Sequence, residues 1–174
     1  GEALTERLEQ ALSASVENEL VTDAVLAQSE RDRRDFWHLR ENIPHSQRQE
    51  GASLKHDVAL PIDRLPIFVS RASAWLKAHV PEGFLVCYGH VGDGNLHFNI
   101  FPPKGAKRSD FAHMTKDVQR LVYDLVAEMG GSFSAEHGIG RLKLDELQHY
   151  GDPVKLAMMR AVKTALDPRG ILNP

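Results

Sequence analysis

The chain has 174 residues, of which 42% are apolar and 26% charged, and a net charge of −3 when its nine histidines are neutral. This composition is typical of a globular domain with a buried core, and the charge excludes the strongly basic surface of a nucleic-acid-binding protein or a polybasic membrane patch. The single cysteine, Cys87, excludes a disulfide framework and a cysteine-based zinc site, and no apolar run reaches the ~18 residues of a membrane span.

The first predicted element is an amphipathic helix over residues 3–18, because apolar residues recur every four positions from Leu4 to Val16. The opening GEALTERLEQ is polar and helical, unlike a signal peptide, and it lacks an initiator methionine. We therefore expect a domain or fragment of a longer chain. The apolar residues within 20–28 predict a strand.

Ser29 is the expected N-cap of a second helix over residues 30–43, which we expect to end before Pro44. The polar stretch from residue 44 to residue 53 is typical of a turn.

The middle of the chain alternates between strand and helix patterns. The predicted elements are a strand over 54–62, a helix over 65–80 with Pro66 in its first turn, and strands over 83–91 and 95–102. The second half continues with a helix over 111–131, a short strand over 132–138, and two helices within 141–168 broken at YGDP. The final DPRGILNP is rich in turn residues and is expected to be a natural C-terminus.

These elements predict an α+β fold: a ferredoxin-like antiparallel sheet with helices on one face, followed by a C-terminal helical subdomain. The expected domains are an α+β domain over residues 1–140 and the helical subdomain over 141–174.

The stretch CYGHVGDGNLHFNI contains two histidines, His90 and His97, on either side of a run of Gly, Asp and Asn that is typical of a turn. If Asp93-Gly94 forms the two-residue centre of a hairpin turn, His90 lies directly opposite His97, and Asn99 shares their face. Two imidazoles so placed can converge on one metal ion. A four- or five-residue loop would change this pairing. The other interpretation is a structural pair of histidines that bind backbone groups.

SAEHGIGRLK adds Glu136 and His137 where a strand runs into a glycine-rich turn. Two histidines and a glutamate form the ligand set of catalytic zinc sites, which leave positions open for substrate. A solvated carboxylate and a structural histidine are the alternative. Two cationic residues, Arg40 and Lys55, are candidates to bind a substrate carboxylate, although a solvated surface charge is the common role of either residue type.

Three functional classes fit these residues: a metal-dependent enzyme, a flavin-free metal-binding module such as a non-haem iron enzyme, and a structural or dimerisation domain with inert histidines. The helical content argues against the non-haem iron class, whose ligands usually lie on a double-sheet β barrel.

Five motifs occur in a fixed order: WHLRENI, KHDVALP, GHVGDGNLHFNI, SAEHGIGRLK and DPRGILNP. Together they resemble the C-terminal, substrate-side domain of the FAD-linked oxidases, a family that includes D-lactate dehydrogenase, the glycolate oxidase flavin subunit and D-2-hydroxyglutarate dehydrogenase. The resemblance extends from about Arg31 to Pro174. It implies an FAD-dependent enzyme that oxidises a D-2-hydroxy acid to the 2-oxo acid. Nothing in the chain resembles the family's phosphate-cradling loop, so the N-terminal FAD-binding domain is expected to lie outside it.

The resemblance also implies roles for individual residues. His90, His97 and Glu136 would be ligands of a divalent metal, with zinc expected first and manganese or iron as alternatives. His137 would be the general base. The substrate-binding residues would be Arg40, Lys55 and Asn99.

One position departs from the pattern, because the hydroxyglutarate enzymes are expected to carry a hydroxyl side chain four residues after the arginine, where this chain has Pro44. This departure weakens the prediction of hydroxyglutarate as the substrate. The expected partners are the 2-hydroxy acid, the protein's own FAD domain, a second copy in a homodimer, and a quinone or electron-transfer flavoprotein as electron acceptor. No nucleic acid or membrane span is expected, and the expected location is the cytoplasm, or the mitochondrion in a eukaryote.

Overall fold

The computed structural model describes residues 2–51, 53–103 and 105–172. The chain divides between Gln49 and Glu50 into two compact units, and each is described by itself. The separate helical subdomain expected over 141–174 lies within the second unit, and its independence stays a prediction.

The first unit consists of two helices, α1 (Glu2–Glu17) and α2 (Glu30–Gln49). The helix expected over residues 3–18 is confirmed. Ser29 is the N-cap of α2, as expected, because its Oγ accepts a hydrogen bond from the backbone N–H of Asp32 at 3.1 Å.

Two expectations for this unit are wrong. Residues 20–28 form no strand, because a strand requires a neighbour for its backbone groups and no described segment pairs with them. The second helix does not end before Pro44 but continues to Gln49. Proline removes only its own N–H from the hydrogen-bond ladder, and the residues that follow include the good helix formers Gln47 and Arg48.

The second unit is built on a three-stranded antiparallel sheet, which confirms the α+β class. Its strands are β1 (Leu54–Ala59), β2 (Phe84–His90) and β3 (Asn95–Phe101), arranged in the order β1-β3-β2. All three strands were expected from the alternation of apolar and polar residues, with ends that differ by a few positions.

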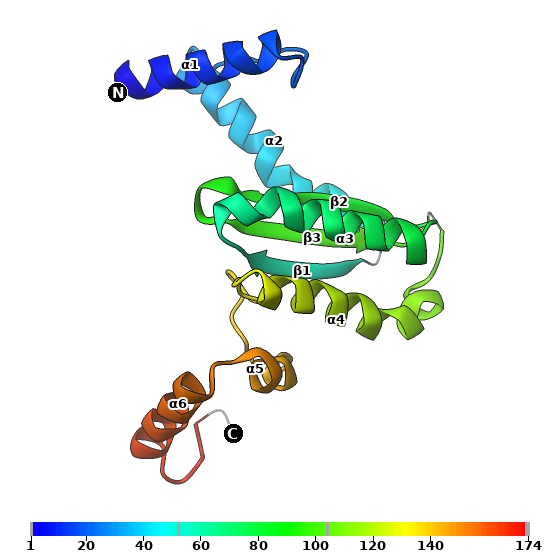
Figure 1. Cartoon of the computed structure of the whole chain (residues 1–174), viewed down its shortest axis with the longest axis vertical. Coiled ribbons are helices and arrows are strands. Elements are labelled where there is room, and N and C mark those ends of the chain that lie inside the picture. Colours follow the sequence, from blue (N-terminus) through cyan, green and yellow to red (C-terminus); the bar gives the residue numbers. More distant parts are fainter. Residues whose placement is uncertain (1, 52, 104, 173–174) are drawn as a thin grey trace. The chain divides into compact units, whose positions relative to one another are not determined.

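One face of this sheet is covered by α3 (Leu65–His79) and α4 (Ala112–Glu128), which Figure 1 shows beside the strands. Side chains from both helices meet alternate residues of the strands in one apolar core. The largest contributors that are almost fully buried are Val58, Phe68, Phe98, Val118, Val122 and Val126. Both helices therefore lie on the same face, as the sequence predicted.

The fourth strand of the expected ferredoxin-like sheet is reduced to a single bridge. Ser132 pairs with Ala59 at the free edge of β1, through backbone hydrogen bonds of 2.7 and 2.9 Å. The strand expected over 132–138 does not continue, because the Ser132 hydroxyl bonds to the backbone of Ser134 and turns the segment locally. The order of elements nonetheless follows the split β-α-β pattern of that fold.

The two C-terminal helices are α5 (Leu144–Tyr150) and α6 (Pro153–Leu166). They are separated at YGDP as expected, and the Asp152 side chain caps α6 by accepting the backbone N–H of Lys155 at 2.8 Å. Leu147 and Tyr150 pack against the core of the second unit.

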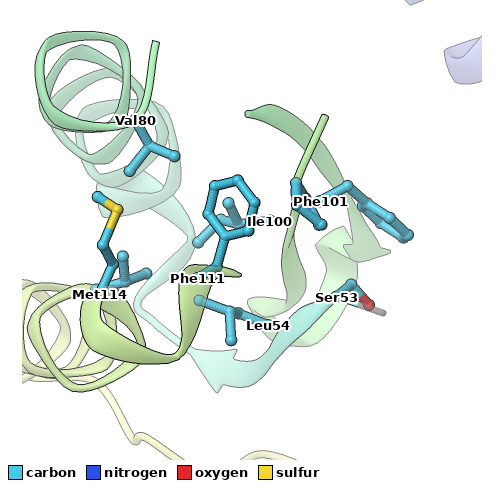
Figure 2. A pocket seen from close by; sticks show the side chains of 9 residues that line it. Ser53, Leu54, Val80, Ile100, Phe101, Phe111 and Met114 are labelled. Carbon is cyan, nitrogen blue, oxygen red and sulfur yellow. The ribbon is translucent and has the colours of Figure 1, made fainter. Parts of the chain in front are cut away.

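A small apolar cavity of about 20 Å³ lies where the sheet meets the end of α3 and the start of α4, as Figure 2 shows. Phe111 and Met114 face Leu54 and Ile100 across it. Its side chains offer almost no hydrogen-bond partners, so it is a packing gap on the apolar side and not a candidate site.

Candidate active site

The face of the sheet opposite the helices is polar. Residues paired directly across antiparallel strands point to the same face, and alternate residues along a strand share that face. Asp57 pairs with His97, which pairs with Tyr88 on its other side, and Lys55 pairs with Asn99. The polar residues of this face are Lys55, Asp57, Tyr88, His90, Asn95, His97 and Asn99, and Ala59, Val86, Phe84 and Phe101 share the face with them.

The expected register of the hairpin is wrong by two positions. His90 pairs with Asn95, while His97 lies opposite Tyr88. The loop therefore contains four residues, 91–94, because a short 3₁₀ turn precedes Gly94. Gly94 has a φ of +75°, and a Cβ there would lie 1.9 Å from the carbonyl oxygen of Leu60. Glycine is therefore required at position 94, as a turn composition suggests, but the turn is a four-residue loop and not the expected two-residue turn.

His90 and His97 nevertheless lie on the same face, as diagonal neighbours. Their ring centroids are 6.4 Å apart, and the planes of the rings are inclined by 74°. The shift of two positions preserves the face because side chains alternate with a period of two. The essential part of the prediction, two imidazoles on one side of the hairpin, is thus confirmed by the geometry.

Glu136 lies next to both imidazoles. Its Oε1 is 2.8 Å from Nδ1 of His90, and its Oε2 is 3.9 Å from Nε2 of His97. Two ligand atoms bound to one zinc ion at ~2.0–2.1 Å each are about 3.3 Å apart. The two observed distances bracket this value. Glu136 is therefore within reach of a metal ion held by either imidazole, but the described residues whose donor atoms all lie within 4.8 Å of one another are Asp57, His97 and Glu136. For His90, His97 and Glu136 to bind one ion, the His90 side chain would have to move toward His97.

Asp57 is the buried carboxylate of this face. It is 4% exposed and accepts hydrogen bonds from Nδ2 of Asn95 at 2.9 Å and from the backbone N–H groups of Glu136 and His137 at 2.8 and 3.0 Å. Burial alone would raise the pKa of this carboxyl, but the three hydrogen bonds hold the pKa of Asp57 below its usual range. Asp57 is therefore an anion fixed at the base of the site.

Asp57 also lies close to the imidazoles. Its Oδ1 is 3.7 Å from Nδ1 of His97, and its Oδ2 is 3.4 Å from Nδ1 of His137. Donor atoms of Asp57, His97 and Glu136 all lie within 4.8 Å of one another. This combination of donors among the described residues shares His97 and Glu136 with the expected ligand set and has Asp57 in place of His90.

His137 extends from the edge of this cluster. Its side chain is 67% exposed, and its ring lies 6.2 Å from that of His97, with the planes 26° apart. Because Nδ1 faces Asp57, Nε2 is the nitrogen left to exchange a proton with a bound molecule. The structure therefore places the expected general base beside the expected metal ligands.

The expected substrate-binding residues divide between the two units. Lys55 and Asn99 are directly paired on the polar face, two residues along their strands from Asp57 and His97. Lys55 is exposed and Asn99 is 4% exposed. Arg40 belongs to α2 in the other unit, and its part in the site stays a prediction.

Comparison with known families shows which protein family the chain belongs to. Residues 1–174 match the family described as FAD linked oxidases, C-terminal domain. The chain belongs to this family. The FAD-linked oxidase domain that the five motifs resemble is thereby confirmed, and its membership argues against a flavin-free module or an inert structural domain.

Several curated relatives of this FAD-linked oxidase domain are named D-2-hydroxyglutarate dehydrogenases. That of Stutzerimonas stutzeri (strain A1501) is 38% identical over 177 residues, covering 99% of this chain and 38% of the relative. The mitochondrial protein of Bos taurus is 39% identical over 167 residues, covering 96% and 29%. That of Arabidopsis thaliana is 36% identical over 170 residues, covering 97% and 29%. The chain thus spans roughly a third of the length of these relatives.

Among the described helices of the FAD-linked oxidase domain, none combines the length and the apolar character that crossing a bilayer requires.

Sequence reasoning missed Asp57, Asn95 and Lys143. The sequence offered one indication of Asp57: aspartate is unfavourable in a strand unless its carboxylate has hydrogen-bond or ion-pair partners. Asn95 donates to it and is 2% exposed. Lys143 donates to the carbonyl of Phe133 and to Oγ of Ser134, both at 3.2 Å, and burial lowers the pKa of its ammonium group. This lysine therefore anchors the segment that leads to Glu136.

Proposed function

We propose that the chain is the substrate-side domain of an FAD-dependent dehydrogenase that oxidises a D-2-hydroxy acid to the corresponding 2-oxo acid. One observation carries the proposal: His90, His97 and Glu136 converge on one sheet face, beside His137 and in line with Lys55 and Asn99. Family membership supports the flavin, and the geometry supports the site.

His90, His97 and Glu136 are the residues that would hold a divalent metal ion, for which we propose zinc, with manganese or iron as alternatives. When bound, the metal supplies Lewis acidity toward the substrate hydroxyl, and the FAD held by the rest of the protein supplies the two-electron acceptor. The side chains of His90 and Glu136 are 45% and 41% exposed, so a small acid has access to this side of the cluster.

The residues of this chain bind and deprotonate the substrate. Lys55 attracts the carboxylate by charge, and Asn99 supplies a neutral hydrogen-bonding amide. That Arg40 also binds the carboxylate stays a prediction from the family resemblance. The hydroxyl proton passes to Nε2 of His137, as the C2 hydrogen leaves with its electron pair toward the flavin. The C2–O single bond becomes a carbonyl, and the 2-oxo acid remains.

Two observations bear on the substrate: one favours D-2-hydroxyglutarate and the other argues against it. The relatives' names favour D-2-hydroxyglutarate. Pro44 stands four residues after Arg40, where a hydroxyl side chain would bind a second carboxylate. We propose D-2-hydroxyglutarate as the first substrate to test, with D-lactate and glycolate as the alternatives that need only one carboxylate contact.

The proposed partners follow from the same family. The FAD-binding domain is expected in the rest of the protein, and the reduced flavin is expected to pass electrons to a quinone or an electron-transfer flavoprotein. A homodimer and a cytoplasmic location, or a mitochondrial one in a eukaryote, remain part of the proposal. The bovine relative is itself named as mitochondrial.

The test is a screen of 2-hydroxy acids with the complete protein, without oxygen, following the loss of the flavin absorption band. We expect bleaching by D-2-hydroxyglutarate, D-lactate or glycolate, and none by the L enantiomers of the first two. A loaded flavoprotein that no D-2-hydroxy acid reduces would contradict the proposal.

A further inference from the structure

We propose that Asp57 is the positioning residue of this site: its one carboxylate fixes both the segment that carries Glu136 and His137 and the ring of His97. The proposal rests on the proposed function, since it explains how the candidate ligands and the candidate base are held.

The first part of the proposal concerns the segment that carries Glu136 and His137. Both of their backbone N–H groups donate to Oδ2 of Asp57, at 2.8 and 3.0 Å. Just before them, the N–H of Ala135 donates to the backbone carbonyl of Asp57 at 3.1 Å. Asp57 thus replaces the ladder of hydrogen bonds that a fourth strand would have made with β1.

This replacement explains how two adjacent side chains reach one site. In a regular strand, Glu136 and His137 would point to opposite faces. Here two successive N–H groups converge on a single oxygen, as in the backbone nests that bind anions. The backbone is therefore turned about the carboxylate, and both side chains lie beside His97.

The second part concerns the imidazole of His97. Its Nδ1 lies 3.7 Å from Oδ1 of Asp57, while its Nε2 lies 3.9 Å from Glu136. A carboxylate on the far nitrogen of a ligating histidine favours the tautomer whose other nitrogen is free to bind a metal. At 3.7 Å the contact is an ion-pair contact and not a hydrogen bond, and it favours the orientation of His97 in which Nε2 faces Glu136.

The role requires a carboxylate rather than an amide. Three N–H donors, from Asn95, Glu136 and His137, end on the two oxygens of Asp57. Asparagine has one acceptor oxygen, and its NH₂ group would face donors. At a position that is 4% exposed, the unmatched groups have little water to replace the lost bonds.

The position of Asp57 within reach of His97 and Glu136 would also suit a direct metal ligand. We favour positioning because both oxygens already accept hydrogen bonds from the protein. The two roles differ in what the Asp57→Asn variant does to metal binding. Loss of a ligand abolishes binding, as His97→Ala should, whereas loss of an orienting group weakens it by about 10–100-fold.

The experiment compares wild type, Asp57→Asn and Asp63→Asn in the complete protein. Asp63 is a matched control, because its side chain is 77% exposed and the substitution makes the same change of charge. For Asp57→Asn we expect kcat to fall about 10–100-fold, KM to change less than about threefold, and the zinc dissociation constant to rise about 10–100-fold. Asp63→Asn should match the wild type in all three.

Amide hydrogen exchange supplies a readout that does not depend on activity. The N–H groups of Glu136 and His137 should exchange slowly in the wild type and faster in Asp57→Asn. If no hydroxy acid reduces the flavin but this difference in exchange is found, the proposed function fails and the positioning role of Asp57 stands. If the wild type is active and Asp57→Asn has unchanged kcat, zinc affinity and exchange, the positioning role fails alone. Complete loss of zinc would also overturn it, in favour of a ligand.

Asn95→Ala covers the case in which Asp57→Asn does not fold. It removes one donor to Asp57 and keeps the charge, so we expect the same changes at about 2–10-fold. Unchanged kcat, zinc affinity and amide exchange in this variant would then overturn the proposal.

Discussion

The two faces of the three-stranded sheet follow opposite rules. On the face toward α3 and α4, Val58 and Phe98 are fully buried among apolar side chains. On the other face, Asp57 and His97 are set among donors and acceptors whose directions are fixed. The same strands carry both sets, one residue apart. Packing volume limits which residues the first face accepts, and hydrogen-bond geometry limits which residues the second face accepts. Substitutions on the first face should therefore lower stability, and substitutions on the second should lower catalysis or metal binding.

The largest expected effect is on the polar face. His137→Ala in the complete protein should lower kcat about 10²–10⁴-fold, since this is the usual contribution of a general base. The free energy of unfolding should stay unchanged, because the side chain is 67% exposed. Steady-state kinetics and urea denaturation measure the two quantities. His113→Ala, at an exposed helical histidine, is the control. Equal turnover in both variants would remove His137 from the role.

Phe98→Ala, on the apolar face, should instead act mainly on stability. The side chain is fully buried and packs edge-on against Phe68 at a centroid distance of 5.3 Å. Its removal should lower the free energy of unfolding by about 3–5 kcal/mol, measured by urea denaturation. Phe84→Ala is the matched control, since Phe84 is 44% exposed and should lose much less. Equal losses of unfolding free energy in Phe98→Ala and Phe84→Ala would mean that buried side-chain volume does not determine the stability of the apolar face.

His56 tests the apolar side by pH. Burial lowers the pKa of His56 from 6.5 to about 4, although its Nδ1–H donates to the carbonyl of Phe98. The unfolded chain therefore binds a proton between pH 6.5 and 4 that the folded chain does not. Stability is full above pH 6.5 and should fall by about 3 kcal/mol on acidification to pH 4.

The measurement for His56 is urea denaturation across this pH range, for wild type and His56→Gln. The difference between the two proteins isolates this residue from the carboxylates that titrate in the same range. We expect a smaller loss on acidification in the variant, and an identical pH dependence would show that His56 is not the source.

The smallest expected effect is at the outer part of the polar face. Lys55→Gln should raise KM for the hydroxy acid about tenfold and leave kcat within about twofold, because it removes a charged contact made equally in the ground and transition states. Steady-state kinetics distinguish this from Lys77→Gln, a change at an exposed lysine of α3. A fall in kcat with KM constant would place Lys55 in the chemical step.

Much of the apolar face could be predicted from the sequence, because its residues alternate with a period of two in strands and recur every three to four positions in helices. Expectations failed where the pattern was the only signal. Residues 20–28 have strand-like composition but no neighbour, and Pro44 lies inside a helix that its surroundings support.

The site was predictable in part. Glycine and aspartate around Gly94 indicated a hairpin, but a two-residue and a four-residue loop share that composition, so the register was wrong while the face was right. Asp57 could not be recognised, because its partners at residues 136 and 137 are about eighty positions away and are backbone groups. Backbone donors leave no trace in the residue types.

The central claim is that His90, His97 and Glu136 form a metal site, and metal content tests it most directly. Elemental analysis of the purified complete protein should find about one equivalent of a divalent metal in the wild type and in His113→Ala, and almost none in His97→Ala. A wild type that binds no divalent metal, or a His97→Ala variant that retains a full equivalent, would contradict the account.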